Sequence, residues 1–253
     1  MRVEKGTDMN DVKRRLARIG KVILVGSGKG GVGKSVVACG LAVSLSSAGF
    51  RTALLDLDIH GASVPGYLGV GPPVRSHEGG LVPKERGRLK VMSLALFTGS
   101  RPVPMRGGEK QELIAQLFGL TDWGALDFLV VDLPPSMGDE LLSAFGLFAG
   151  KSQLVLVTTP SPSAVQVVAR LRRLAESEGV PVTGVVLNMA YLREGGRVSQ
   201  PLGKLGERAV KRSLGVEIAR IPLDPEVNSK GLRNALGKRS DFSRAFKELA
   251  KKV

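Results

Sequence analysis

The sequence predicts an α/β fold, a doubly wound and mostly parallel sheet with helices on both of its faces. Short apolar runs, often β-branched, alternate with amphipathic segments along the 253 residues. The runs are continuously apolar, which is the pattern of strands that are covered on both faces. Apolar residues make up 43% of the chain and aromatic residues only 4%, so we expect a sizeable, mainly aliphatic core.

Seven strands are expected in chain order, and their apolar runs cover 22–25, 52–55, 89–94, 128–131, 154–157, 182–187 and 216–221. Helical patterns lie between them near 34–48, 109–119, 138–149, 162–178 and 203–214. Residues 71–90, rich in Gly, Pro and charged residues, are expected to form a loop that does not divide the chain. We therefore interpret 1–253 as one domain, with an N-terminal amphipathic extension over 1–20 and a C-terminal helix over 240–253.

The two ends carry apolar stripes at helical spacing. One stripe consists of Met9, Val12, Leu16 and Ile19, and the other of Phe242, Phe246, Leu249 and Val253. Packing on the sheet is the commoner use of such stripes, and a surface that faces a membrane or nucleic acid is the alternative.

The chain is strongly basic, with 37 Lys and Arg against 23 Asp and Glu and a formal charge of +14. Residues 191–253 hold 15 of the basic and 7 of the acidic residues, a net +8. Such an excess suits nucleic acid, anionic membranes or phosphorylated ligands, although it also arises as background. A single cysteine, Cys39, excludes an internal disulfide framework. No run approaches the ~20 apolar residues of a membrane span, so we expect a soluble, cytoplasmic protein without a transmembrane segment.

The most informative stretch is GSGKGGVGKS over 26–35. Gly28, Gly33, Lys34 and Ser35 match the phosphate-loop pattern, between an expected strand and an expected helix. In this pattern glycines let backbone amides surround a phosphate, and the helix N-terminus adds positive potential. Lys34 is then expected to reach the β- and γ-phosphates of a nucleotide and Ser35 to ligate Mg²⁺.

Carboxylates follow two other expected strands. Asp56 and Asp58 follow the run 52–55, and Asp132 follows 128–131. Parallel sheets bind their ligands at the carboxyl ends of the strands. Asp132 is therefore expected to hold Mg²⁺ beside the phosphate loop.

The segment KGGVGKS over 29–35 resembles the deviant Walker A motif of the ParA/MinD and nitrogenase-iron-protein class. Further stretches resemble the Mrp/ApbC branch of that class, whose members are ATP-dependent iron–sulfur cluster carriers. They are LLDLDIHGASVP (54–65), MRG (105–107), WGALD (123–127), VDLPP (131–135), VVLNM (185–189) and IPLDP (221–225). The resemblance runs from about residue 20 to 250.

This resemblance implies a homodimer that binds ATP or ADP with Mg²⁺. The residues implied in nucleotide binding are Gly28, Lys29, Gly30, Gly31, Val32, Gly33, Lys34, Ser35, Val36, Asn188, Pro222, Leu223 and Asp224. Lys29 would reach across the dimer to the partner's phosphates, and Asp58 would orient the attacking water, so that Lys29, Lys34 and Asp58 are the implied catalytic residues. Ser35, Asp56 and Asp132 would hold the hydrated Mg²⁺.

Asn188 would pair with adenine, beside a base pocket formed by 222–224. Residues 133–140 would form a switch, with Gly138 as its hinge.

The resemblance breaks at the cluster ligands. The Mrp branch carries a Cys-x-x-Cys shortly after the stretch that corresponds to Asn188–Tyr191, and here LREGGR over 192–197 replaces it. A cluster that bridges a dimer needs about four thiolates, whereas Cys39 is expected to be a packing residue inside a helix. We therefore do not expect an iron–sulfur cluster on the usual ligands. Val36 stands where the family has Thr, and Ser136-Met137 stands where it has Gly-Thr.

Two functions remain open from the sequence. One is a Mrp-like ATPase in iron–sulfur or metal maturation, which includes the metallochaperone for [NiFe]-hydrogenase on the same scaffold. The Pro-Pro switch, Arg106-Gly107 and Asn188–Tyr191 favour it. The other is a ParA/MinD-like positioning ATPase that binds DNA or membrane, which the missing cysteines and the basic C-terminal quarter favour. Nucleic acid is the less favoured partner because no aromatic residues are interleaved for base stacking, and the sequence does not name a client protein.

Overall fold

A computed structural model describes residues 9–59, 61–98, 107–204 and 207–253. Within these residues the central sheet has eight strands in the order β12-β9-β8-β1-β7-β2-β6-β5. Their bounds are β1 (Ile19–Gly26), β2 (Thr52–Asp56), β5 (Lys84–Arg86), β6 (Leu89–Ser93), β7 (Leu126–Asp132), β8 (Ser152–Thr158), β9 (Val182–Leu187) and β12 (Glu217–Arg220). Every neighbouring pair is parallel except β5–β6, which is antiparallel. The predicted sheet is confirmed, and each of the seven expected runs forms one of its strands.

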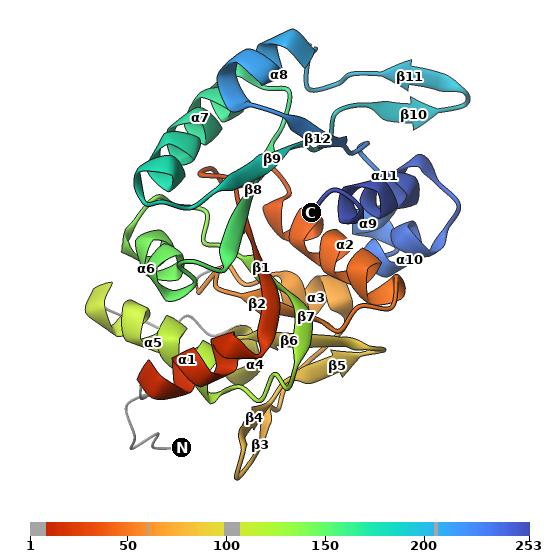
Figure 1. Ribbon diagram of the computed structural model, residues 1–253. Helices are drawn as coiled ribbons and strands as arrows, with labels where there is room; N and C mark the ends of the chain where they lie inside the picture. The colour runs from red at the N-terminus through yellow and green to blue at the C-terminus, as the bar shows by residue number, and fades with distance from the viewer. Residues whose placement is uncertain (1–8, 60, 99–106, 205–206) are drawn as a thin grey trace.

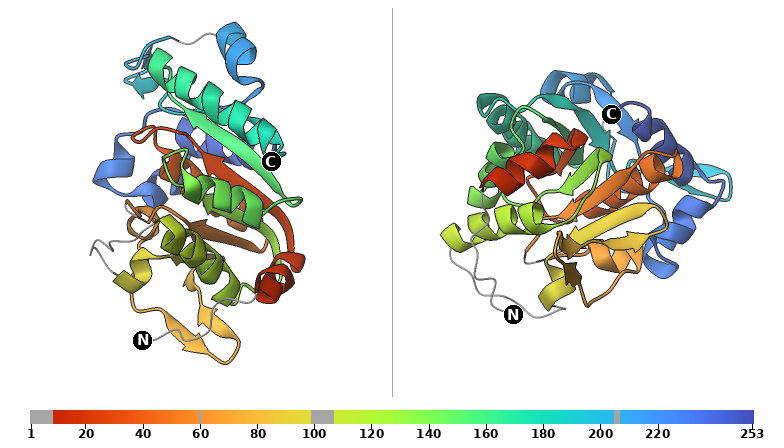
Figure 2. Two further views of the ribbon diagram at one scale, coloured as in Figure 1. Left: turned by 90° about the vertical axis from the view of Figure 1, so that its left-hand side faces the viewer. Right: turned by 60° about the horizontal axis from the view of Figure 1, so that its bottom comes forward.

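Helices cover both faces of this sheet, as the doubly wound prediction requires (Figures 1 and 2). One face packs on α1 (Met9–Ala17), α5 (Gly107–Leu120), α6 (Asp139–Leu147), α7 (Pro162–Ser177) and α8 (Glu207–Leu214). The other packs on α2 (Lys34–Ser47), α3 (Val64–Leu68), α10 (Leu232–Gly237) and α11 (Asp241–Ala250). Successive residues of β1 alternate between the two cores, Leu24 in one and Val25 in the other. Both sets of side chains are apolar because neither face meets water.

Several short elements were not expected. The segment 71–90, predicted as a loop, contains β3 (Arg75–His77), β4 (Gly80–Val82) and the edge strand β5. A second hairpin joins β10 (Leu192–Glu194) to β11 (Arg197–Ser199) where the family motif would place its cysteines. Four short helices were not expected either, namely α3, α10, α4 (Ala95–Thr98) and α9 (Glu226–Ser229). Ile19 was wrongly included in the N-terminal helical stripe, because it begins β1.

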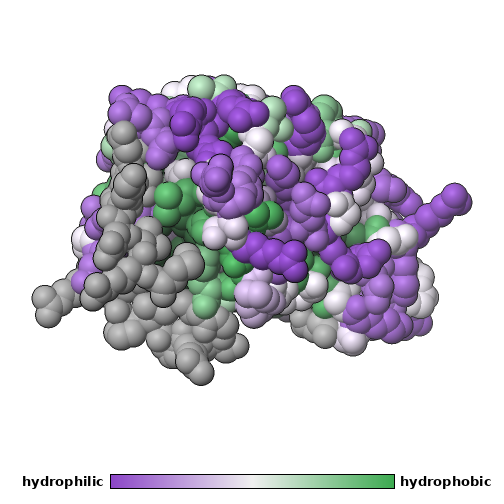
Figure 3. All heavy atoms as spheres, turned by 90° about the horizontal axis from the view of Figure 1, so that it is seen from below, coloured by the Kyte–Doolittle hydropathy of each residue, from purple (hydrophilic) through white to green (hydrophobic). Residues whose placement is uncertain are grey.

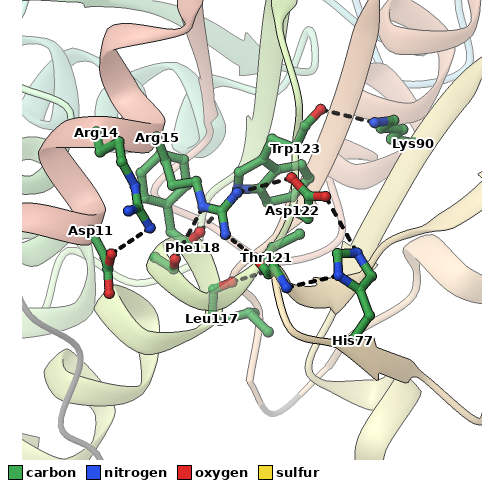
Figure 4. Close-up of polar contacts among 12 residues, drawn as sticks. Asp11, Arg14, Arg15, His77, Lys90, Leu117, Phe118, Thr121, Asp122 and Trp123 are labelled. Atoms are coloured by element: carbon green, nitrogen blue, oxygen red, sulfur yellow. Dashed lines mark hydrogen bonds and ion pairs between the residues drawn. The ribbon is translucent and has the colours of Figure 1, made fainter.

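The N-terminal helix packs against the fold. Val12 is only 2% exposed in the core beneath α1, and α1 contacts α5. Arg15 is buried too, and its guanidinium donates to Asp122 Oδ1 (2.9 Å), to the carbonyl of Gly119 (3.4 Å) and to that of Gly79 (Figure 4). His77 accepts from the N–H of Gly79 through Nδ1 (2.8 Å), and its Nε2 lies 3.4 Å from Asp122 Oδ2. This network fastens α1 to the β3–β4 hairpin and to the end of α5.

The C-terminal stripe also faces the core. Phe242, Phe246 and Leu249 are at most 3% exposed, and α11 contacts α2. The ring of Phe246 lies so close to Gly40 of α2 that a Cβ there would come within 2.3 Å of it. The absence of a side chain at residue 40 is what lets the two helices approach.

The face of the molecule that is seen from below is largely polar where the structure describes it. Figure 3 shows hydrophilic residues over most of the lower face, with hydrophobic ones gathered near its middle. Among the described residues, no helix is both long enough and apolar enough to span a membrane.

Candidate functional site

The phosphate-loop segment connects β1 in the middle of the sheet to the start of α2. Gly28, Gly31 and Gly33 have φ angles of 61°, 80° and 80°, a region that side-chain-bearing residues rarely adopt. Gly33 is the N-cap of α2 and no side chain caps the helix. The first backbone hydrogen bond runs from Val37 N–H to the Gly33 carbonyl (3.0 Å). The N–H groups of the first turn are therefore available to an anion at the positive end of the helix.

Lys34 and Asp132 form a buried ion pair next to this turn. Lys34 Nζ donates to Asp132 Oδ1 at 2.7 Å, and the two side chains are 6% and 0% exposed. Lys34 Nζ also lies 3.5 Å from the Ser35 hydroxyl. The other oxygen of Asp132, Oδ2, is buried and has no hydrogen-bond partner in the described structure. A buried, unpartnered carboxylate oxygen indicates a place for a further ligand.

Asp56 lies next to Asp132 on the neighbouring strand, because the two residues are register partners on β2 and β7. Both oxygens of Asp56 accept hydrogen bonds, Oδ1 from the Asp58 N–H (3.0 Å) and Oδ2 from the Ser93 hydroxyl (3.1 Å). Burial, together with the nearby charge of Asp132, raises the pKa of Asp56 to about 7. Burial also raises the pKa of Asp132, although Lys34 opposes this shift. Two carboxyl groups and one lysine thus lie together in a buried site, where a divalent cation would relieve the repulsion between the carboxylates.

Asp58 lies beyond the end of β2 and is partly exposed. Its Oδ1 accepts from the N–H of Gly61 (2.8 Å), which orients the carboxylate at the wall of a cavity. The backbone N–H of Asp58 also donates to Asp56 Oδ1, which stabilises the turn that follows β2. Asp56 therefore helps to fix the position of Asp58 by accepting a hydrogen bond from its backbone N–H.

Asn188 closes the other end of the site. It follows β9, is 3% exposed, and its Nδ2 donates to the Val32 carbonyl at 2.8 Å. A Cβ on Gly33 would lie 2.2 Å from this Nδ2. The phosphate-loop segment and the predicted base-binding amide are therefore packed directly together, and Gly33 is needed both for its φ angle and for this contact.

A cavity of about 330 Å³ collects most of the residues that the sequence pointed to. Those lining it are Lys29, Gly30, Gly31, Gly33, Lys34, Ser35, Val36, Asp58, Asn188, Pro222, Leu223 and Asp224. Gly28, Val32, Asp56 and Asp132 do not line it. The last three are hydrogen-bonded to residues that do. The sequence analysis missed Gly61, Ser63, Tyr67, Met189, Val227 and Phe242 as wall residues. Phe242 carried a signal, its place in the C-terminal stripe, but that signal indicated packing alone.

Lys29 differs from the other charged residues of the site. It is exposed at the mouth of the cavity, and its Nζ donates to the hydroxyl of Ser163 on α7 at 3.3 Å. Within the described residues no carboxylate pairs with it. An exposed ammonium group that is bonded only to a neutral hydroxyl can reorient toward an anion at a small cost in free energy.

The predicted switch over 133–140 lies between β7 and the start of α6, and Pro135 reaches the cavity wall. Glu140 pairs with Lys110 of α5 at 2.8 Å, so this end of the segment is tied to a neighbouring helix. Gly138 is the N-cap of α6, and its role as a hinge stays a prediction. His60, Met105 and Arg106, which belong to the family-like stretches, lie outside the described residues.

The ligands for a soft metal are not gathered here. Cys39 is 0% exposed inside α2, and burial raises the pKa of its thiol well above the usual value. Across the described parts of the chain, no group of three or more His, Cys, Asp or Glu side chains is arranged to hold a metal. The carboxylate and hydroxyl oxygens at residues 35, 56 and 132 are hard donors, which suit Mg²⁺ and not an iron–sulfur cluster.

Comparison with known proteins agrees with this geometry. A model of the ParA family, described as NUBPL iron-transfer P-loop NTPase, matches residues 18–253. An iron–sulfur cluster carrier protein of Saccharolobus solfataricus is 35% identical over 223 residues, which are 85% of this chain and 75% of that protein. A protein of the same name from Bacillus subtilis is 38% identical over 207 residues, 79% of this chain. The chain spans 58% of the length of that Bacillus protein.

Solved structures show the same fold. A nucleotide-binding protein from Archaeoglobus fulgidus, solved in complex with ADP, is 30% identical with a TM-score of 0.73, and the match covers 97% of this chain and 93% of that one. The cell-division ATPase MinD of Pyrococcus furiosus is 24% identical with a TM-score of 0.71, covering 92% and 98%. At 24% identity, the match to MinD shows a shared fold.

Proposed function

This chain belongs to the ParA family of NUBPL-type iron-transfer P-loop NTPases, and from that premise we propose that it binds ATP or ADP and hydrolyses ATP with Mg²⁺. We further propose that residues 1–253 act as one ATPase domain, as a homodimer, in the cytoplasm, in the maturation of iron–sulfur clusters or other metal centres. The observation that carries the proposal is the buried Lys34–Asp132 pair beside the uncapped start of α2. It places a lysine ammonium group and a turn of free N–H groups next to each other.

Nucleotide binding follows from this arrangement. The N–H groups of the first turn of α2 would bind phosphate oxygens, and Lys34 would exchange its hydrogen bond to Asp132 for one to phosphate. Asn188, Pro222 and Leu223 would take the base at the opposite end of the cavity. The ADP complex of the Archaeoglobus relative supports a nucleotide in this site.

The donor set also fits Mg²⁺. Asp132 carries a buried oxygen without a partner, and Ser35 supplies a hydroxyl at the cavity wall. Ser35 and Asp132 would hold the ion, and Asp56 would stabilise its charge from across the sheet. Bound there, Mg²⁺ neutralises negative charge on the phosphates.

Hydrolysis would then depend on Asp58 and Lys29. Asp58 is held by Gly61 and by its backbone bond to Asp56, so its carboxylate is placed to orient an attacking water. Lys29 is exposed at the cavity mouth, and in a face-to-face dimer it would stabilise charge on the partner's nucleotide.

Cluster carriage requires ligands from elsewhere. One cysteine per chain, buried and with a raised thiol pKa, does not supply the thiolates of a bridging cluster. We therefore propose that any cluster or metal is held with ligands of a partner protein. After anaerobic incubation with iron and sulfide, we expect no cluster absorbance to survive desalting of the protein alone. A stoichiometric absorbance that survives would contradict this part of the proposal.

The alternative function, a positioning ATPase on DNA, is weakened by ion pairs in the basic C-terminal quarter. Lys230 and Lys238 pair with Glu226 (3.1 and 2.5 Å), and Arg193 and Arg244 pair with Asp241 (2.7 and 3.4 Å). Four of the basic side chains there are therefore engaged by carboxylates of the same chain, which leaves fewer of them free for DNA and favours the maturation function.

The central test is calorimetry of ADP binding to Lys34→Ala. We expect at least a roughly hundredfold loss of affinity, because a charge-assisted contact to phosphate disappears and Asp132 is left buried without its cation. Lys29→Ala is the matched control, since it removes an exposed lysine from the same loop and should leave ADP affinity within about twofold. Wild-type affinity in Lys34→Ala would refute the phosphate-loop assignment.

A further inference from the structure

Two adjoining cavities lie at the C-terminal end of α2, far along this helix from the phosphate-loop segment. One, of about 290 Å³, lies between α2, α10 and the β5–β6 turn, and the other, of about 570 Å³, lies between α2, α11 and Phe128 of β7. They share Val43, Ser47 and Leu236 as wall residues. Figure 1 shows this end of α2 beside α10 and close to β5. We call the two cavities together the α2 groove.

The charged side chains that line the α2 groove are all positive. Arg86, Arg88 and Arg233 line the first cavity, Lys247 and Lys251 line the second, and neither wall contains an Asp or Glu. Lys251 pairs with Glu248 at the surface (2.7 Å). Within the described residues the other four have no carboxylate partner. Unpaired guanidinium groups from two separate elements converge on one cavity, which is an arrangement that recognises carboxylates or phosphates.

The floor of the α2 groove is apolar. Leu68, Leu89 and Leu232 are buried beneath the arginines. In the second cavity Phe50 is 44% exposed and packs edge-on against Phe128, with ring centroids 5.1 Å apart. An occupant therefore gains both by burying apolar atoms and by placing negative charge at the rim.

We propose that the α2 groove binds a short acidic segment of a partner protein, with one or two apolar side chains inserted into the floor. Concave walls accept side chains that protrude from a peptide, whereas a bilayer surface is bound by apolar side chains that protrude from the protein. Among the residues lining the groove, Phe50 is the one exposed large hydrophobic side chain. A nucleic-acid backbone would satisfy the arginines and leave the apolar floor unfilled.

This site is physically joined to the nucleotide cavity by two helices. α2 runs from Lys34 at the phosphate-loop segment to the groove residues Val43 and Ser47. α11 presents Phe242 to the nucleotide cavity, and Ser243 and Lys247 to the groove. The proposal does not depend on ATP hydrolysis, so peptide binding is measured on the nucleotide-free and the ADP-bound protein alike.

The test is selection of short random peptides on the full chain, followed by binding measurements on those enriched. We expect acidic peptides with apolar residues, whose affinity falls as salt rises. The groove variant combines Arg86→Glu, Arg88→Glu and Arg233→Glu and should weaken them roughly tenfold or more. The charge-matched control combines Arg75→Glu, Arg170→Glu and Arg173→Glu, all exposed residues outside the groove, and should stay within about twofold of the wild type.

A second variant tests the floor without changing charge. Phe50→Ser should weaken the same peptides several-fold, and unchanged ADP affinity shows that the variants are folded. Equal losses in the groove and control variants would reduce the effect to net charge and overturn the proposal. Enriched peptides without acidic residues, or no enrichment at all, would overturn it too. So would groove-dependent binding of phosphatidylglycerol vesicles or duplex DNA without peptide binding.

Discussion

At the scale of single residues, the site brings together two buried carboxyl groups and one buried lysine. Lys34 neutralises Asp132 directly, whereas Asp56 has hydrogen-bond donors but no cation of its own. This explains why the pKa of Asp56 rises to about 7, under burial and the charge of Asp132. In the nucleotide-free protein the ionised form of Asp56 is therefore destabilised, and a bound cation would stabilise it.

The pH dependence of stability follows from this shift. A carboxyl group with a folded pKa of about 7 and an unfolded pKa of about 4 binds more protons in the folded state between these values. The nucleotide-free protein should thus lose stability from Asp56 as the pH rises from about 4 to about 7, and regain none above. Asp56→Asn removes the ionisation, while the amide oxygen can still accept from the Asp58 N–H and the amide N–H can donate to the Ser93 hydroxyl in place of accepting from it.

We expect Asp56→Asn to raise the melting temperature of the nucleotide-free protein at pH 8 by several degrees, at roughly 2–4 °C per kcal/mol for a chain of this size. At about pH 4 the difference should vanish. Asp127→Asn is the opposite control, because Arg51 lowers the pKa of Asp127 to about 2. The ionised carboxylate of Asp127 therefore stabilises the wild-type protein at neutral pH, and this stabilisation is lost as the pH falls toward 2. A melting-temperature difference for Asp56→Asn that does not change with pH would contradict the assignment.

At the scale of elements, the N-terminal helix is held by one buried arginine. Arg15 satisfies Asp122 and two backbone carbonyls from separate segments, and its side chain is about one-tenth exposed. Arg15→Met keeps much of the packing but leaves these acceptors without a donor. We expect it to lower the free energy of unfolding by about 2–4 kcal/mol, measured by urea denaturation.

The neighbouring Arg14 gives the matched control. It pairs with Asp11 at 2.6 Å, but its side chain is 67% exposed. Arg14→Met should change the free energy of unfolding by less than about 0.5 kcal/mol. If both substitutions cost the same, the buried network of Arg15 does not anchor α1.

The parts of this fold that the sequence could predict are those with a local physical cause. Runs such as 22–25 and 128–131 read as strands because both faces of β1 and β7 are covered. The β10–β11 hairpin was missed because its residues 193, 194 and 197–199 are exposed and its strands are three residues long, so no hydrophobic pattern marks it. Gly33 and Lys34 were found from the spacing of the phosphate-loop pattern alone. The reason is that the positive φ angle and the lysine are required within the loop itself, whatever the rest of the fold. Tyr67 and Phe242 were not found as wall residues, because only tertiary packing brings α3 and α11 to the cavity.

At the scale of the whole molecule, the exposed cation at the cavity mouth is placed as the proposed dimer requires. Lys29 lies beside the nucleotide cavity but is held by a single hydroxyl of α7. Turning it to the partner's nucleotide would stabilise phosphate charge, so ATP binding and association of two copies would favour each other. The proposed dimer therefore predicts that nucleotide state controls size in solution.

Asp58→Asn should make this coupling visible. It retains the acceptor for the Gly61 N–H but removes the carboxylate charge, so ATP turnover should fall roughly a hundredfold while nucleotide contacts persist. With ATP and Mg²⁺ we then expect a stable dimer in light-scattering chromatography, and with ADP a monomer. Adding Lys29→Ala to Asp58→Asn removes the cation that would reach across and should return the ATP-bound protein to a monomer. A monomeric Asp58→Asn with ATP would argue against the dimer, and a double variant that stays dimeric would argue against the role of Lys29 in it.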